Sequence, residues 1–168
     1  MSECFLLLGT NLGNRKLNLQ KSLKALENKA GTISHISAVY ETEPWGFEAE
    51  TAFLNMAIRM KTAFSPLELL RVAKEIEQQM GRTETTGNGY TSRPMDIDIL
   101  FFNNEVINVE NLTIPHPLLA ERKFALLPLF EICPEYVHPI LGITVSELLD
   151  KCTDEGKVTK WSNNKSIF

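Results

Sequence analysis

The order of its hydrophobic patterns limits the folds open to this chain. Residues 4–8 form an apolar run that ends at a glycine-containing loop, and leucines then recur at mostly helical spacing over residues 17–26, up to Gly31. Residues 33–42 alternate β-branched and aromatic residues with polar ones, and residues 53–61 form a second extended run. The first half of the chain therefore predicts a strand, a helix and two further strands.

The second half begins with a strong helix signal. Ser65 can cap a helix that has proline in its first turn and Glu68 at the third position, and the apolar pattern that follows ends near Gly81. Residues 96–102 then predict a strand. Asn103 and Asn104 predict a turn, with residues 105–107 as the hairpin partner of that strand.

The resulting order, β-α-β-β-α-β, is typical of a ferredoxin-like α+β sandwich, in which an antiparallel sheet carries two helices on one face. Short helices are expected near residues 117–121, 124–130 and 145–149. With 168 residues, 43% of them hydrophobic, the chain fits one domain over residues 1–168.

Composition also excludes several classes of protein. The longest apolar runs are far shorter than the roughly 20 residues of a membrane span, and the N-terminus lacks an export leader, so we expect a cytoplasmic protein without membrane contact. A net charge of -4 disfavours nonspecific nucleic-acid binding. The three scattered cysteines are expected to be reduced thiols: Cys4, Cys133 and Cys152.

Two acids at the start of a predicted strand are the strongest chemical signal. Asp96 and Asp98 would point to the same face with alpha carbons ~6.6 Å apart, and hard oxygen ligands suit Mg²⁺. The alternative is a solvated strand end. Arg93 stands three residues before Asp96 and favours a site, because it ends a polar stretch, residues 82–93, which we expect to be a mobile loop.

Other polar and aromatic residues could bind a nucleotide or a flat ring. Guanidinium groups and imidazole suit phosphate oxygens, although each such residue alone is more often a surface charge or structural. Aromatic rings with a side-chain amide suit a flat heterocycle, although aromatics on strands are more often core. Residues 9–14 follow a predicted strand and precede a predicted helix, as phosphate-binding loops do, but they lack the Gly-Lys-Ser/Thr ending of a P-loop. We therefore interpret them as a turn. The candidates are Arg82, Arg93, His116 and Arg122 for phosphate, and Thr42, Trp45, Phe53, Asn55 and Phe124 for a heterocycle.

Several short motifs in order give the chain a family resemblance over roughly residues 5–149. They are Gly9-Thr10-Asn11-Leu12, Tyr40-x-Thr42-x-Pro44-x-Gly46, Phe53-Leu54-Asn55, Ile76-Glu77 with Gly81-Arg82, Ser92-Arg93-x-x-Asp96-Ile97-Asp98-Ile99, Leu112-Thr113-Ile114-Pro115-His116, Arg122-x-Phe124 and Pro128-Leu129-x-Glu131-Ile132. The chain resembles 6-hydroxymethyl-7,8-dihydropterin pyrophosphokinases of the folate pathway. Residues 150–168 form a divergent tail without a match.

The resemblance implies transfer of pyrophosphate from ATP to the hydroxymethyl group of a reduced pterin, with AMP released. It also implies two Mg²⁺ ions on Asp96 and Asp98, and small-molecule substrates. We expect a monomer that binds neither nucleic acid nor a membrane. The implied catalytic residues are Arg82, Arg93, Asp96 and Asp98. The implied ATP-binding residues are Glu77, Arg82, Arg93, Ile99, Thr113, His116 and Arg122, the implied pterin-binding residues are Thr42, Glu43, Trp45, Phe53, Asn55 and Phe124, and Tyr90 would cover the site.

No residue stands out as the general base. Either a metal lowers the pKa of the substrate hydroxyl, or an oxygen of Asp98 accepts its proton.

Two other functions fit the same residues less completely. A nucleotidyltransferase or phosphohydrolase could use the same two acids, and would turn over ATP without a pterin. A ferredoxin-like binding module without catalysis would not need both acids and all four cationic side chains.

Overall fold

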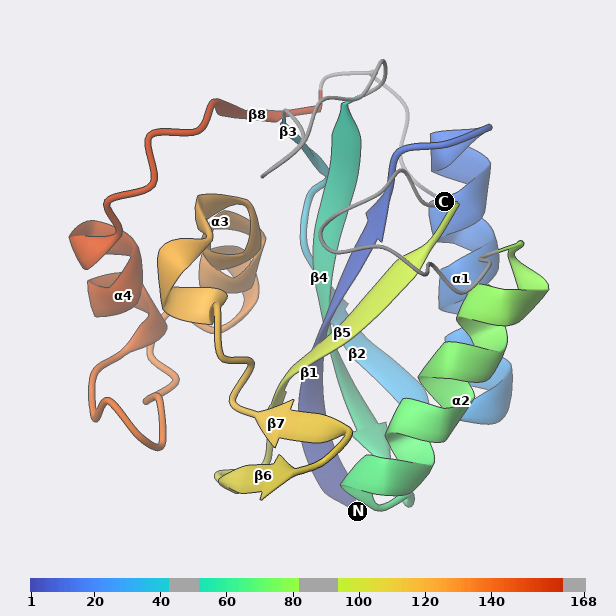
Figure 1. Ribbon diagram of the computed structural model, residues 1–168, viewed down its shortest axis with the longest axis horizontal. Helices are drawn as coiled ribbons and strands as arrows, with labels where there is room; N and C mark the ends of the chain where they lie inside the picture. The colour runs from blue at the N-terminus through green and yellow to red at the C-terminus, as the bar shows by residue number, and fades with distance from the viewer. Residues whose placement is uncertain (43–51, 82–93, 162–168) are drawn as a thin grey trace.

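The computed structural model describes residues 1–42, 52–81 and 94–161. An antiparallel sheet with strand order β5-β1-β4-β3-β8 forms its centre, and β2 also pairs with β4 (Figure 1). The predicted α+β class with an antiparallel sheet is confirmed. The strands are β1 (Ser2–Thr10), β2 (Thr32–Ile36), β3 (Tyr40–Thr42), β4 (Phe53–Thr62), β5 (Asp96–Phe102) and β8 (Val158–Lys160).

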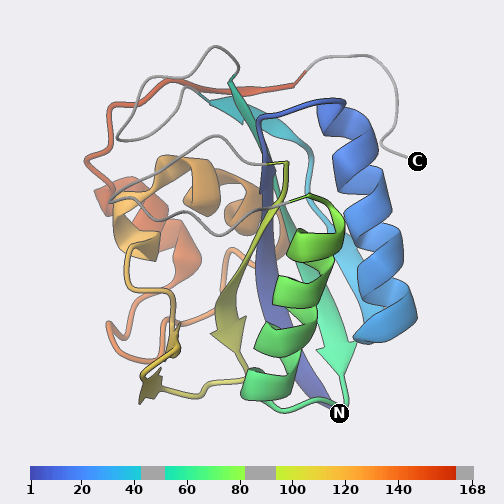
Figure 2. The ribbon, with the colours of Figure 1, turned by 45° about the vertical axis from the view of Figure 1, so that its right-hand side comes forward.

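Helices cover both faces of this sheet. One face, here called the back face, packs against α1 (Arg15–Lys29) and α2 (Pro66–Gln79), and the opposite face packs against α3 (Lys123–Ile132), with α4 (Val145–Lys151) beside it (Figures 1 and 2). We call this second face the site face. Successive side chains of a strand point to opposite faces, so each face has its own apolar cluster.

The two long helices begin as their sequences predict. The Ser65 hydroxyl accepts a hydrogen bond from the Glu68 N–H at 3.2 Å, and the Glu68 carboxylate accepts one from the Ser65 N–H at 2.7 Å. This reciprocal pair satisfies two N–H groups at the start of α2. The Asn14 side chain likewise accepts from the Leu17 N–H at 3.0 Å and caps α1. The short helices near residues 117–121, 124–130 and 145–149 are also present, as a 3-10 turn (Leu119–Glu121), α3 and α4.

Residues 33–42 do not form one strand, as the sequence predicted, but two. Both β2 and β3 pair with β4, yet one extra residue lies between the pairs Ile36–Ile58 and Tyr40–Asn55. Ser37 accommodates this irregularity, because its N–H donates to the Ala57 carbonyl and its hydroxyl accepts from the Ala57 N–H, each at 2.9 Å. A side-chain oxygen thus replaces a backbone acceptor in the ladder.

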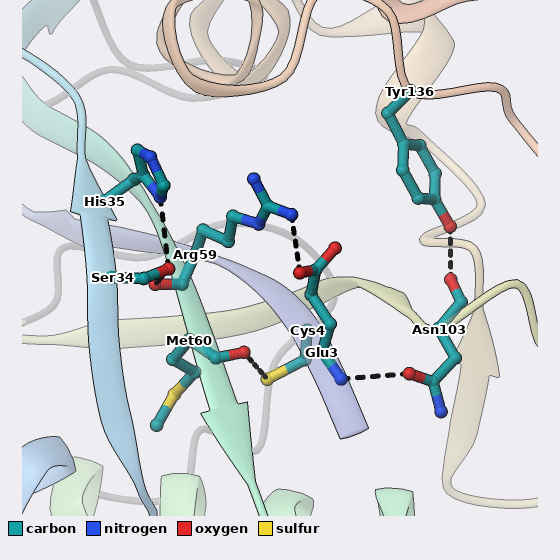
Figure 3. Close-up of polar contacts among 8 residues, drawn as sticks. All are labelled: Glu3, Cys4, Ser34, His35, Arg59, Met60, Asn103 and Tyr136. Atoms are coloured by element: carbon teal, nitrogen blue, oxygen red, sulfur yellow. Dashed lines mark hydrogen bonds and ion pairs between the residues drawn. The ribbon is translucent and has the colours of Figure 1, made fainter. Parts of the chain in front are cut away.

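The predicted hairpin of residues 96–102 with residues 105–107 is wrong. Asn103 turns the chain with a φ of 48°, exchanges bonds of 2.9 and 2.7 Å with the backbone of Glu3, and accepts a bond from the Tyr136 hydroxyl (Figure 3). These bonds direct the chain away from β5. The hairpin forms instead between β6 (Ile107–Val109) and β7 (Leu112–Ile114).

The tail contains structure that the sequence did not predict. After α4 the chain returns to the sheet, where β8 pairs antiparallel with β3. All three cysteines are unpaired, and burial raises the pKa of the Cys4 and Cys133 thiols to about 12. Within the described ranges, no helix has the length and apolar character needed to cross a bilayer.

Candidate active site

Strand register places the candidate residues in adjacent rows on the site face. Gly9 of β1 lies opposite Asp96 of β5 on one side and opposite Asn55 of β4 on the other, and Asn55 lies opposite Tyr40 of β3. The neighbouring row pairs Phe53 with Thr42. Because neighbouring strands are about 4.8 Å apart, Asp96 and Asn55 are roughly 10 Å apart across the sheet.

The acid pair, Asp96 and Asp98, begins β5 on the site face. The residues that alternate with it, Ile97 and Ile99, are buried in the cluster beneath α1 and α2. Both aspartates are half-buried. Their carboxylates therefore project from one side of a strand whose other side is fixed in the core.

Three further hydrogen bonds fix the backbone around the acid pair. The buried Glu77 carboxylate on α2 accepts a hydrogen bond from the Ile97 N–H at 3.2 Å. The Pro94 carbonyl accepts from the Thr10 hydroxyl at 2.5 Å and from the Asn18 side-chain amide at 3.2 Å. The strand is thus held from α1, β1 and α2, which gives the acid pair a preformed position.

His116 lies on the acid side of the site. Its N–H donates to the Leu100 carbonyl of β5 at 3.1 Å, and its Nδ1 accepts from the Leu118 N–H at 3.2 Å. Burial lowers the pKa of His116, although the charge of Asp96 acts in the opposite direction. The neutral ring therefore carries its proton on Nε2, where it is a donor.

Arg122 precedes α3 and is 4% exposed. Its guanidinium carbon lies 5.5 Å from the centre of the Phe124 ring, a distance typical of a cation–π contact. Burial lowers the pKa of Arg122 to about 10, so the side chain stays charged at neutral pH. A buried cation here provides a positive charge for an anionic ligand.

The heterocycle candidates surround a buried amide. Asn55 is 4% exposed, and its Nδ2 has no hydrogen-bond partner within the described parts of the chain. A Cβ atom at Gly9 would lie 2.7 Å from the Asn55 Oδ1, so this amide position requires glycine on the neighbouring strand. An unsatisfied buried donor is costly, and a ligand with an acceptor at its edge would remove that cost.

Three predicted ATP-binding residues lie around β5 in different environments. Ile99 has its side chain in the back-face core, so only its main chain can face a nucleotide, and the Glu77 carboxylate contacts the strand backbone. Thr113 is exposed on β7, whose hairpin packs beside β5. Five predicted site residues lie outside the described residues: Glu43, Trp45, Arg82, Tyr90 and Arg93.

Sequence reasoning missed the supporting roles of Thr10, Asn18 and Glu131. The Glu131 carboxylate on α3 accepts hydrogen bonds from the Tyr40 hydroxyl and, at 3.2 Å, from the Ala38 N–H. It thereby joins α3 to β3 across 91 residues of sequence. Such a long separation leaves no local pattern, although both residues lie within motifs of the family resemblance.

Comparison with protein families identifies the family to which the chain belongs. The family model for 7,8-dihydro-6-hydroxymethylpterin-pyrophosphokinase (HPPK) matches residues 5–134 of this chain. The chain belongs to this family of pterin pyrophosphokinases.

Individual relatives cover most of the chain. The 2-amino-4-hydroxy-6-hydroxymethyldihydropteridine pyrophosphokinase of Bacillus subtilis is 37% identical over 97% of this chain and 92% of its own length. The enzyme of the same name from Aquifex aeolicus is 42% identical over 83% and 86% of the two chains.

Solved structures agree in fold. An HPPK-DHPS in complex with substrates has a TM-score of 0.74 at 20% identity, over 89% of this chain and 43% of that chain. Plasmodium falciparum HPPK-DHPS with pteroate has a TM-score of 0.75 at 23% identity, over 89% and 42%. This chain therefore spans less than half the length of either structure.

Proposed function

We propose that this chain transfers a pyrophosphoryl group from ATP to the hydroxymethyl oxygen of 6-hydroxymethyl-7,8-dihydropterin, producing AMP and the pterin diphosphate for folate synthesis. The observation that carries the proposal is the row Asp96–Gly9–Asn55 in a chain of the pterin pyrophosphokinase family. This row has acids suited to a metal-bound polyphosphate at one end and a buried amide donor at the other.

The acid side is proposed to bind ATP. Asp96 and Asp98 are oxygen donors suited to Mg²⁺, and two bound ions would neutralise phosphate charge. Within the described ranges no group of three or more His, Cys, Asp or Glu residues gathers as a ligand set, so phosphate oxygens and water would complete the coordination. His116 and Arg122 would donate to phosphate oxygens, joined by Arg82 and Arg93.

The amide side is proposed to bind the pterin. Asn55 would donate through its Nδ2 to an acceptor at the edge of the pterin ring, with Thr42 as a second polar contact. Phe53 and Phe124 would lie against the two faces of the ring. Glu43, Trp45 and Tyr90 are proposed to complete the pocket, as the family resemblance implies.

Catalysis of this transfer depends more on aligning the two substrates than on covalent participation of the protein. The pterin hydroxymethyl oxygen attacks the β-phosphorus and gives up its proton, for which an oxygen of Asp98 is a candidate acceptor. The bond from that phosphorus to the oxygen bridging the α-phosphate breaks, and AMP leaves with the bridging oxygen. Holding the two substrates in line supplies much of the acceleration for such transfers, and cationic donors stabilise the charge that develops on the leaving oxygen.

Product analysis tests the proposal. Purified protein, ATP, Mg²⁺ and 6-hydroxymethyl-7,8-dihydropterin should yield AMP and the pterin diphosphate in equal amounts, with neither formed when pterin or Mg²⁺ is omitted. ATP consumption without pterin would instead support a phosphohydrolase. A folded protein that binds pterin but transfers nothing would support a binding module.

Two related proposals need measurements of their own. We propose that the chain acts as a monomer in the cytoplasm, with small molecules as its only partners. Sedimentation at micromolar concentration should give a mass near 19.0 kDa. A mass twice as large would refute the monomer, and cell fractionation would check the location.

A further inference from the structure

The segment that connects α4 to β8 lies beyond the residues that match the family model, which end at residue 134. It passes from the side of the molecule where α3 and α4 lie to the outer edge of the sheet beside β3 (Figure 1). Cys152 packs against the site-face cluster, and Trp161 packs against the back-face cluster. The Trp161 N–H also donates to the Val39 carbonyl at 2.8 Å. Both ends of residues 152–161 are therefore fixed.

The first internal contact of this segment is with the start of α3. The Asp154 carboxylate accepts a hydrogen bond from the Lys123 N–H at 3.1 Å through Oδ2 and one from the Gly156 N–H at 2.8 Å through Oδ1. Lys123 is the first residue of α3, between Arg122 and Phe124. Arg122 stands at the N-cap position, and its guanidinium has only donors. Asp154 therefore supplies from the tail a cap acceptor that this position cannot supply itself.

The second contact is with β3. Strand β8 pairs Val158 with Thr42 and Lys160 with Tyr40, and the Thr42 hydroxyl donates to the Lys157 carbonyl at 3.3 Å. Without β8, the three residues of β3 would form a short edge strand paired only with β4. The segment thus gives β3 a partner on its outer side.

We infer that residues 154–160, the clasp, hold the two walls of the pterin site at a fixed separation and so determine pterin affinity. One wall is Phe124 on α3, whose first turn Asp154 caps. The other is Phe53 of β4 with its paired neighbour Thr42 of β3, the strand that β8 supports. The inference rests on the proposed function, because it assigns the pterin to these walls. Asp154 is a positioning residue and touches no substrate.

The clasp acts on one substrate more than on the other. The acid pair lies on β5, which is separated from β3 by β1 and β4 and is held by Glu77, Thr10 and Asn18. None of these supports involves the clasp. Arg122, a proposed phosphate donor, adjoins the contact between Lys123 and Asp154, whereas the acid pair does not. Loosening the clasp should therefore weaken pterin binding more than ATP binding.

The substitution Asp154→Ala tests this inference, with Glu155→Ala as its matched control. Glu155 is the exposed neighbouring acid, so its removal makes the same change in charge. Direct titration with pterin should show Kd raised about fivefold to tenfold for Asp154→Ala, as expected for loss of one helix cap, and unchanged for Glu155→Ala. In steady-state assays the KM for pterin should rise by a similar factor, and the KM for ATP by a smaller factor.

A gentler variant keeps the test decisive if Asp154→Ala folds poorly. Asp154→Asn retains one acceptor oxygen and should give an intermediate pterin Kd, with faster hydrogen exchange at the start of α3 than in wild type. A pterin Kd within twofold of wild type in both Asp154 variants, or an equal loss of ATP and pterin affinity, would overturn the clasp while leaving the proposed function intact. Failure of the wild-type protein itself to bind pterin would overturn both.

Discussion

Replacing Gly9 by alanine tests whether the packing between β1 and β4 sets the position of the Asn55 amide. The added Cβ would lie 2.7 Å from the Asn55 Oδ1, whereas ordinary van der Waals contact begins near 3.4 Å. The amide must therefore move by about 0.7 Å or the strands must separate, and the side chain is only 4% exposed. Overpacking of this kind typically costs about 1–3 kcal/mol of folding free energy.

Pterin affinity is a more direct test of the amide position than stability is. A displaced amide donor no longer meets its acceptor on the pterin edge, so we expect pterin Kd to rise at least about tenfold, which corresponds to about 1.4 kcal/mol. Fluorescence titration with pterin measures this change. Thermal unfolding of the same samples measures the change in stability.

A double mutant separates the steric contact from a general weakening of the sheet. In the Asn55→Ala background the clashing Oδ1 is gone, so Gly9→Ala should cost little further stability. The two substitutions should therefore be strongly non-additive, with a coupling of about 1 kcal/mol or more. Additive losses of stability, or normal pterin affinity in Gly9→Ala, would refute the proposed dependence of the amide on Gly9.

Three further perturbations test other parts of the structure. Asp98→Ala should reduce the rate of AMP formation by at least about a hundredfold with Tm near wild type, and near-normal turnover would refute the role of the acid pair. Tyr40→Phe removes the hydroxyl donor to Glu131 and should cost about 1 kcal/mol of unfolding free energy, with pterin KM raised more than ATP KM; unchanged stability by urea unfolding would contradict the proposed link between α3 and β3. Burial lowers the pKa of His138, whose Nδ1 accepts from the N–H groups of Ile140 at 3.2 Å and Leu141 at 3.1 Å. The unfolded chain, with a His pKa near 6.5, therefore binds more protons below that pH, and stability should fall as pH drops from about 7 to 5. His138→Asn keeps a side-chain acceptor that does not titrate. Its free energy of unfolding, measured with urea at each pH, should therefore fall less steeply between pH 7 and 5 than that of wild type. An equally steep fall in both proteins would show that His138 is not the cause.

Local signals in the sequence predicted much of the fold. The reciprocal cap of Ser65 and Glu68 and the apolar run of residues 96–102 involve neighbours in sequence, and both predictions are confirmed. The broken strand at Ser37 and the misplaced hairpin depend on partners distant in sequence, Ala57 and Glu3. No local pattern encodes those partners.

Local patterns likewise predicted only part of the candidate site. Alternation along a strand was enough to predict that Asp96 and Asp98 share a face. The alignment of Asp96, Gly9 and Asn55 required the register of β5, β1 and β4, which the sequence alone does not give. The clasp could not be predicted at all, because a three-residue strand such as β8 carries too few residues for a recognisable alternation.

The direction of β1 has a practical consequence for handling the protein. The strand extends nine residues from Ser2 to Thr10, and the proposed site lies at the Thr10 end. At about 3.3 Å per residue, Ser2 is some 26 Å from Thr10. An affinity tag or surface linker attached before Met1 therefore leaves from the end of the sheet remote from both proposed substrates, and immobilisation through it should leave the binding face open to solution.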